Sequence, residues 1–187
     1  MTTTRYASTP LAGPTATGPD VARVRAAIAD VPDPELPPVT IGMLGMLHEL
    51  DVDGGHVYVE LLPTFAGCPA TDMIERDVVA AASAVPGVDE VTVRFRFNPP
   101  WTPDRIDAVG RERLREFGIA PPGGATGAPA PDGRVTLPLM LGPASDPRPC
   151  PYCGSADTVR ESNFGPTPCR DVRFCDACQQ PFEAFKA

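Results

Sequence analysis

The sequence predicts an α/β (α+β) protein in which a small three-stranded sheet is covered by helices and is followed by a C-terminal four-cysteine zinc-ribbon module. Helix-like and strand-like apolar patterns alternate through residues 20–118. Nearly half of residues 118–149 are Gly or Pro, which is typical of a linker. Two Cys-x-x-Cys pairs follow. We therefore expect a disordered tail at 1–19, an α/β domain at 20–118, a linker at 119–148 and a ribbon at 149–187.

The first elements expected are a helix and a hairpin. Asp20 is a suitable N-cap, and the apolar residues at helical spacing after it are Val21, Val24, Ile28 and Val31. The proline-rich stretch "PDPELPP" ends this helix. Two apolar runs, "LGMLHEL" and "HVYVELL", then surround a turn at Gly54-Gly55 and predict a β-hairpin.

A helix, a strand and a last helix complete the domain. The helix after residue 69 should bury Ile74, Val78, Ala81 and Val85. In "VDEVTVRFRF", residues Val91, Val93, Phe95 and Phe97 share one side of a predicted strand. For the last helix, Thr102 is the expected N-cap and Gly118 the expected stop. The apolar insert "RVTLPLML" in the linker should pack somewhere.

Composition excludes several classes of function. The net charge of −8 argues against nonspecific nucleic-acid binding and against docking on anionic membranes. No run approaches the roughly 20 apolar residues of a membrane span. The N-terminus does not have the pattern of a secretory signal. The chain has six cysteines, and two pairs of them have the Cys-x-x-Cys spacing of metal ligands, which indicates a reducing compartment, so we expect a cytoplasmic protein.

The C-terminal cysteines predict a metal site. Cys150 and Cys153 form one pair and Cys175 and Cys178 the other, which is the spacing of a tetrahedral four-thiolate site. Zn²⁺ is the expected metal, with a rubredoxin-like iron as the alternative. The module has no excess of basic residues, so it favours protein docking over nucleic-acid binding.

Two further cysteines are candidates for chemistry. Cys68 lies in "LLPTFAGCPATDM", where Pro69 would start a helix and make Cys68 its N-cap. Backbone donors there favour a reactive thiolate, although a buried, inert cysteine is equally compatible with the pattern. Cys169 is either a small side chain in the ribbon hairpin or a reactive or alternative ligand near the metal.

Other polar residues have weaker signals. Asp33 and Glu35 in the proline-rich loop, and Thr64 after the second strand, are either ordinary turn residues or part of a site around Cys68. The histidines, His48 and His56, have no metal-ligand spacing and are expected to be ordinary strand or turn residues. Arg94 and Arg96 share a strand face that is either solvated or a patch for an acidic partner.

Several of these motifs resemble a known family. "DPELPPVTIGMLGML", "LLPTFAGCPATDMIERDV" and "NPPWTPDRIDAVGRERLREFGIAPP" are similar to the MIP-type iron–sulfur assembly domain, and the cysteine-rich tail is similar to its PaaD branch, accessory to phenylacetyl-CoA epoxidase. The resemblance implies that Cys68 is the family's reactive cysteine, with Asp33, Glu35 and Thr64 around it. It also strengthens Cys169 as a cofactor-binding candidate.

The resemblance implies a function in phenylacetate catabolism. The protein would be a non-catalytic maturation factor that transiently holds iron or an iron–sulfur cluster at Cys68, while the ribbon docks the client. The expected partners are the epoxidase components, especially the iron–sulfur reductase, and a homodimer remains open. One thiol cannot fill a cluster's requirement for four ligands, so transfer would occur in a complex. The alternative function is that of a structural subunit of the oxygenase complex.

Overall fold

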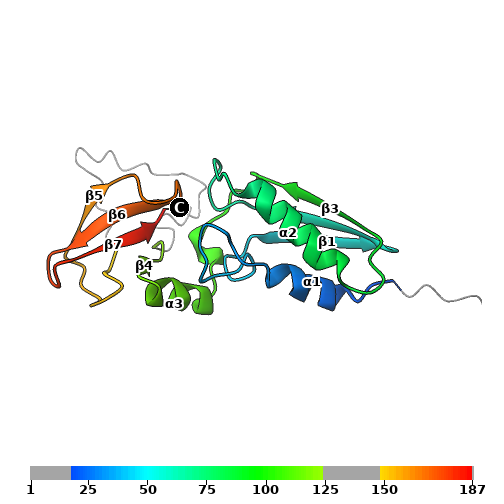
Figure 1. The fold of residues 1–187 in the computed structure, drawn as a ribbon, viewed down its shortest axis with the longest axis horizontal. Helices are drawn as coiled ribbons and strands as arrows, with labels where there is room; N and C mark the ends of the chain where they lie inside the picture. Colours follow the sequence, from blue (N-terminus) through cyan, green and yellow to red (C-terminus); the bar gives the residue numbers. More distant parts are fainter. Residues whose placement is uncertain (1–17, 124–147, 187) are drawn as a thin grey trace, which may run out of the picture.

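The computed structural model describes residues 18–123 and 148–186, which form two units side by side (Figure 1). One unit contains helices α1 and α2 and a three-stranded sheet, and the other contains a four-stranded sheet with α3 beside it. The predicted tail lies almost entirely outside the described residues, as does the apolar insert of the linker. In the described part of the chain, no helix combines the length and apolarity needed to cross a bilayer.

Helix α1 (Val21–Ala29) starts where the sequence predicts. The Asp20 side chain accepts hydrogen bonds from the backbone N–H groups of Ala22 and Arg23 and so caps the helix. Val24 and Ile28 are fully buried in the core. The loop after α1 is held by backbone hydrogen bonds, including one from Asp33 to Val39, and it positions Asp33 and Glu35.

The predicted hairpin is confirmed. Strands β1 (Leu47–Asp53) and β2 (His56–Leu61) pair antiparallel, with Asp53 opposite His56. Gly54 in the turn has φ 59°, a left-handed conformation that favours glycine. On β2, Val57, Val59 and Leu61 face the core, so the alternation seen in the sequence corresponds to the buried side.

Helix α2 (Thr71–Ser83) connects β2 to β3 (Glu90–Phe95), which pairs parallel with β2 to give the sheet order β1-β2-β3. Ile74, Val78 and Ala82 are the buried residues of α2. Helices α1 and α2 pack together over the face of the sheet that carries the core residues of β2. Phe97, predicted to continue the buried side of β3, lies beyond the strand and is exposed.

The last helix begins later than predicted. Thr102 precedes a short 3-10 turn, η1 (Pro103–Arg105), and makes no side-chain cap. Helix α3 (Ala108–Glu116) is capped instead by Asp107, whose side chain accepts a hydrogen bond of 2.6 Å from the backbone N–H of Gly110. Gly118 follows the helix with φ 85°, as expected for a glycine stop.

The ribbon is a four-stranded sheet in the order β4-β7-β6-β5. Its long strands are β5 (Thr158–Ser162), β6 (Arg170–Cys175) and β7 (Gln180–Phe185). Each of these strands pairs antiparallel with the next one along the chain. The fourth strand, β4 (Ile119–Ala120), pairs parallel with β7. The ribbon sheet therefore includes two residues that the sequence pattern assigned to the linker.

The two units share one core. Phe185 at the end of β7, Ile119 and Cys169 belong to the same buried cluster as the residues of α1, α2 and β2. The rings of Phe185 and Trp101 lie 5.9 Å apart, and the Trp101 indole N–H donates a 2.8 Å hydrogen bond to the Leu44 carbonyl. We call this contact between Trp101, Phe185 and their neighbours the seam. It holds the start of β6 against the loops of the first unit.

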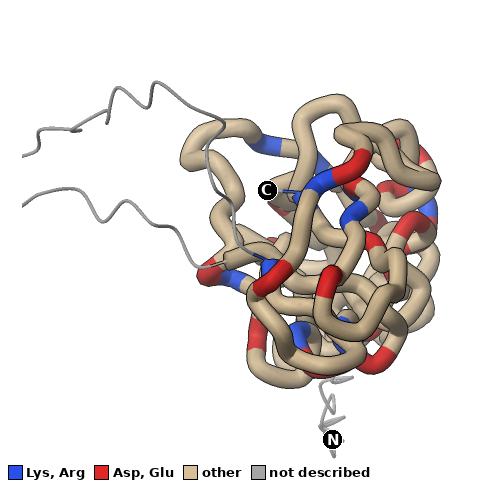
Figure 2. The backbone as a smooth tube through the Cα atoms, turned by 90° about the vertical axis from the view of Figure 1, so that its left-hand side faces the viewer, with Lys and Arg blue, Asp and Glu red and all other residues tan. Residues whose placement is uncertain are grey.

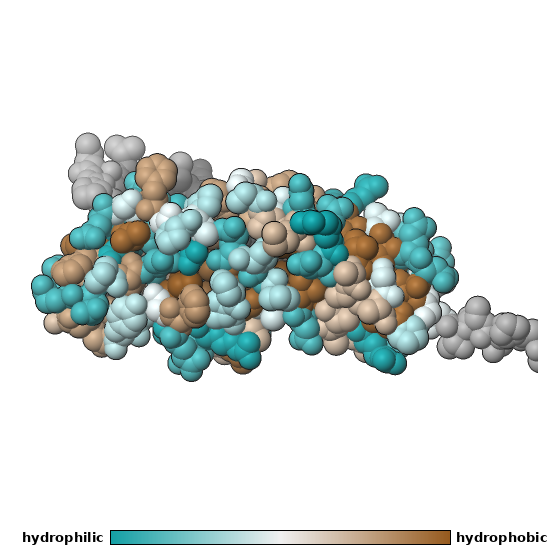
Figure 3. Space-filling view, in the orientation of Figure 1, coloured by the Kyte–Doolittle hydropathy of each residue, from teal (hydrophilic) through white to brown (hydrophobic). Residues whose placement is uncertain are grey.

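Charged residues of both signs are spread over the ribbon end of the molecule (Figure 2). Basic and acidic positions alternate along the backbone at the ribbon end of the molecule, without a long stretch of one sign among the described residues (Figure 2). On the side seen in Figure 3, apolar side chains show between hydrophilic ones along the molecule and do not gather in a single large patch.

Candidate functional site

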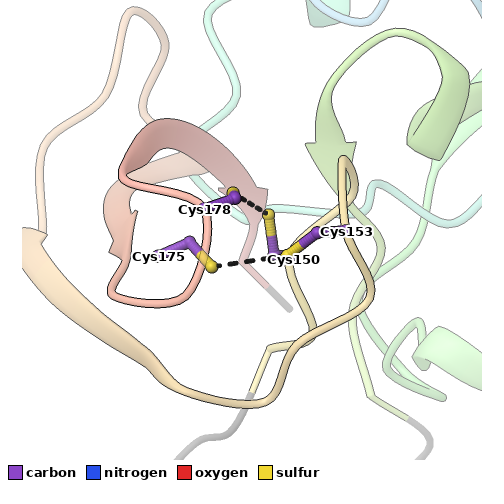
Figure 4. A group of neighbouring side chains, drawn as sticks. All are labelled: Cys150, Cys153, Cys175 and Cys178. Carbon is purple, nitrogen blue, oxygen red and sulfur yellow. Dashed lines mark hydrogen bonds between the residues drawn. The ribbon is translucent and has the colours of Figure 1, made fainter.

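The four ribbon cysteines converge on one point (Figure 4). Cys150 and Cys153 lie in the turn before β5, whereas Cys175 ends β6 and Cys178 follows in the turn to β7. The sulfur atoms of Cys150 and Cys178 are 3.7 Å apart, those of Cys153 and Cys175 are 3.6 Å apart, and all four lie within 4.8 Å of one another. A tetrahedron of metal–sulfur bonds of about 2.3 Å has edges of about 3.8 Å, so the arrangement fits a four-thiolate metal site.

Each Cys-x-x-Cys pair of this site lies in a turn of the same type. The backbone N–H of Gly154 bonds to the Cys150 carbonyl and that of Gln179 to the Cys175 carbonyl, each at 2.8 Å. Gly154 and Gln179 both have positive φ, of 75° and 59°. Each turn aims backbone N–H groups at sulfur: those of Cys178 and Ala177 lower the pKa of Cys175 to about 7. These donors favour the thiolate at Cys175, whereas burial raises the pKa of Cys178 to about 12.

Cys68 lies in the loop between β2 and α2 and is half-buried. The prediction that it caps α2 is wrong: the helix begins at Thr71, with Ala70 at the N-cap position and no side-chain cap. The Ala70 backbone N–H still bonds to the sulfur and lowers the pKa of the thiol, but burial raises that pKa by more. Metal-free Cys68 is consequently a thiol at neutral pH and not the thiolate that the sequence pattern favoured.

The acidic loop after α1 lies beside Cys68. Asp33 is 4% exposed, and its Oδ1 accepts hydrogen bonds from the backbone N–H groups of Glu35, at 2.8 Å, and Leu36, at 2.9 Å. Burial raises the pKa of the Asp33 carboxyl against the effect of these bonds. Glu35 Oε2 is buried and has no hydrogen-bond partner among the described residues. Asp33 and Glu35 are therefore not the solvated turn residues of the alternative interpretation.

Cys169 reaches the same region from the ribbon. It is 5% exposed, and its sulfur lies 3.1 Å from the Thr167 hydroxyl. Electrostatic interactions with Asp33, Cys169 and Glu35 raise the pKa of the Cys68 thiol. Asp33 and Glu35 also raise the pKa of the Cys169 thiol, whereas Arg170 lowers it. Burial is the main cause that raises the pKa of the Cys169 thiol. The fold has brought together two thiols that are far apart in sequence.

Cys169 is distant from the ribbon metal site. It precedes β6, whereas Cys175 ends that strand, and six residues of extended chain span about 20 Å. Cys169 is also absent from the group of mutually close metal ligands. The expectation that any reactive role of Cys169 would be near the ribbon metal is therefore wrong, because the strand carries it to the opposite end.

Thr64 is less closely associated with Cys68. It is half-buried and lines a pocket of about 200 Å³ with Arg96, Phe97 and Trp101, among others. In the described chain, no hydrogen bond joins its side chain to Cys68. Sequence reasoning missed Thr167, which contacts Cys169; the Thr-x-Cys spacing of "GPTPC" was the available signal.

The remaining candidates are surface residues of the sheet. The His56 ring stacks on Tyr58 with centroids 4.0 Å apart, and its Nε2 lies 2.9 Å from the Thr92 hydroxyl. His48 is exposed. Arg96 pairs with Glu60 at 2.8 Å. Neither histidine belongs to a metal-ligand cluster within the described ranges.

Comparison with known proteins assigns a class to each part of this fold. Residues 21–93 match the family model described as "Iron-sulfur cluster assembly protein". Residues 140–186 match the model described as "PaaD zinc beta ribbon domain". The class of protein is therefore an iron–sulfur assembly domain joined to a metal-binding ribbon.

Whole-chain similarity narrows this class. The chain is 35% identical over 168 residues to a protein of Escherichia coli (strain K12) provisionally named as a subunit of 1,2-phenylacetyl-CoA epoxidase, and the match covers 90% of this chain and 93% of that relative. The present chain therefore belongs to the PaaD family. Over 92 residues, the chain is 34% identical to the Fe-S protein maturation auxiliary factor YitW of Bacillus subtilis (strain 168), a match that covers 49% of this chain and 89% of that protein. The factor SufT of Staphylococcus aureus (strain USA300) is 33% identical over 44% of this chain and 93% of its own length.

Proposed function

We propose that this protein matures an iron–sulfur protein of the phenylacetyl-CoA epoxidase system, with Cys68 as the residue that transiently holds iron or a cluster. The proposal fits the iron–sulfur assembly family and the name of the E. coli relative. The observation that carries it is the position of Cys68: a half-buried thiol in a loop beside the buried carboxylate of Asp33. Asp33, Glu35 and Thr64 would shape the pocket around the bound iron.

The chemistry of this position favours a carrier over an enzyme. A nucleophilic cysteine needs a lowered pKa at neutral pH, whereas burial raises the pKa of Cys68. A cation can displace the thiol proton and gain from the carboxylates nearby, so the same surroundings that discourage nucleophilic attack favour metal capture. We therefore propose that the protein has no catalytic activity of its own.

We propose Zn²⁺ as the ribbon metal, and docking of the client, most simply the iron–sulfur reductase, as the role of the ribbon. Zinc is favoured over iron because structural sites with four cysteines are its usual setting. Metal analysis with an absorption spectrum of the purified protein distinguishes the two, since zinc gives a colourless protein and rubredoxin-like iron a red one. The cysteines favour a cytoplasmic location. We propose the domain limits given above, except that Ile119 and Ala120 belong to the ribbon sheet.

The test is cluster occupancy of the reductase. The reductase is co-expressed with this protein, with its Cys68→Ser variant, or with Ala66→Ser, which adds a hydroxyl to the exposed part of the same loop. We expect the cluster content per reductase to fall with Cys68→Ser and to stay at the wild-type level with Ala66→Ser. Equal occupancy in all three would overturn the proposal.

The second candidate is a structural role in the oxygenase complex. It is supported by the word subunit in the name of the E. coli relative. Epoxidase assembled from fully matured components should then lose activity when this protein is omitted. Unchanged activity would eliminate the structural role and leave maturation.

A further inference from the structure

We infer that Cys169 is a second thiolate ligand of the Cys68 site, and that these two thiols with the carboxylates of Asp33 and Glu35 bind one thiophilic divalent cation within a single chain. This site is separate from the four-cysteine ribbon site. The inference deepens the proposed function by naming the ligands, and it rests on that function only for the identity of the cargo, Fe²⁺.

The position of Cys169 is set by both units. Its carbonyl accepts a 2.8 Å hydrogen bond from the backbone N–H of Lys186, which ties it to the end of β7. β7 is in turn anchored in the shared core by Phe185. Cys68 packs against this same cluster from the opposite unit. The two thiols thus reach one region because the ribbon docks on the first unit.

The donor set is suited to a cation. Two thiolates and two carboxylates carry four negative charges when ionised, and soft sulfur with hard oxygen ligands suits Fe²⁺, Zn²⁺ or Co²⁺. The positive charge that acts on Cys169 is that of Arg170, which is already paired with Glu183 at 2.6 Å. Glu35 Oε2 has no hydrogen-bond partner in the described chain although it is buried. Burying such an oxygen is unfavourable unless a partner compensates, and a bound cation would provide one.

The two metal sites differ in preorganisation. The ribbon sulfurs already lie within 4.8 Å of one another, whereas the Cys68 group is not among the described clusters that meet this limit. Binding at the second site must therefore draw the Cys68 loop toward Cys169. Closing the site consumes part of the binding free energy, so the ribbon should retain its metal while the second site exchanges it. Exchange is the property that a carrier requires.

A surface pocket lies between the loops that carry the two cysteines. A pocket of about 450 Å³ is lined by Phe65 from the Cys68 loop, by residues 164–168 just before Cys169, and by Lys186. Phe164 at its edge is 85% exposed. A client bound in this pocket would contact both loops.

The test uses the full chain with zinc in the ribbon and Co²⁺ as the probe, under anaerobic conditions. We expect wild-type protein to keep its zinc and to bind one further Co²⁺ per chain, with a thiolate-to-cobalt charge-transfer band. Cys68→Ser and Cys169→Ser should each lose about half of that band and weaken binding at least about tenfold, since even the loss of a supporting partner costs about 10–100-fold. Glu35→Gln should weaken binding while the band per bound cobalt is retained.

The matched control is Glu75→Gln, which removes an equal charge from an exposed position on α2. It should bind cobalt as wild type does. Because Cys169→Ser removes a buried group, the wild-type protein provides a second measurement: the charge-transfer band per bound Co²⁺ should have the intensity of two thiolate ligands, and bound Co²⁺ should protect the half-buried Cys68 from alkylation. A wild-type band with the intensity of a single thiolate, or an unchanged band in Cys169→Ser, would overturn the assignment.

The failures of the two proposals can be told apart. If cobalt binds as expected but Cys68→Ser leaves the reductase fully loaded, the metal site stands and the maturation function falls. If Cys68→Ser empties the reductase while Cys169→Ser binds cobalt normally, maturation stands and Cys169 is not a ligand.

Discussion

Removal of the Phe185 ring is expected to open the seam between the two units. The side chain is fully buried, so its transfer from water contributes about 3 kcal/mol. Its contact with the Trp101 ring, 5.9 Å away, adds about 1 kcal/mol. Phe185→Ala should therefore lower the free energy of unfolding by about 4 kcal/mol, within the usual range of about 3–5 for this substitution.

The assay is urea unfolding followed by tryptophan fluorescence, because Trp101 is the only tryptophan of the chain and lies in the seam. Phe164→Ala is the control: it removes the same ring from an 85% exposed position of the ribbon and should change stability by less than about 0.5 kcal/mol. A loss below about 1 kcal/mol for Phe185→Ala, with unchanged emission in the folded state, would refute the shared core. The loosened seam should also weaken cobalt binding at the Cys68 site.

Three other changes test separate parts of the structure. Gly45→Ala should destabilise the protein by at least about 2 kcal/mol in thermal unfolding, because Gly45 has φ 62° and an added methyl would collide with the Arg105 carbonyl; an unchanged melting temperature would contradict this. The alkylation rate of metal-free Cys68 should rise with pH to a midpoint above the ordinary thiol pKa of 9.0, because the folded-state pKa is raised and the thiolate forms only at higher pH. Asp33→Asn should lower that midpoint, since the Asp33 charge raises the pKa of Cys68. A midpoint below 9.0 in the wild-type protein would refute the assignment. Cys175→Ser should lose the ribbon metal and the slow amide exchange of the ribbon strands, since a ribbon of this size depends on metal for its folding. It should also lower the protection of the first unit, because unfolding the ribbon withdraws Phe185 from the shared core; full metal content by elemental analysis would disprove that dependence.

Local patterns were sufficient for most elements of the first unit. The Asp20 cap, the Gly54 turn and the alternation of Val57 and Val59 act over a few residues, so the chain itself carries the signal. The start of the last helix was predicted at Thr102 but is capped by Asp107, because a side chain five residues later makes the better hydrogen bond. The N-cap of α2 was also predicted too early: it lies at Ala70, two residues after Cys68, and has no side-chain cap.

The ribbon metal site was also available from the sequence. Cys-x-x-Cys spacing puts two sulfurs on one tight turn, so two copies of the pattern nearly determine the four ligands. The site around Cys68 was not derivable in this way. Its ligands lie in three loops, and which loops meet depends on how the two units pack.

The sequence by itself determined the helices, the hairpin, the four ribbon ligands and the family motifs, because each depends on neighbours within a few residues. Only the tertiary structure decided that Cys169 lies with Cys68, Asp33 and Glu35 and not with the ribbon metal. The physical reason is the burial of Phe185 and Ile119 in the first unit's core, which docks the ribbon in one orientation. That docking places one end of β6 at the seam and the other, with Cys175, at the metal site.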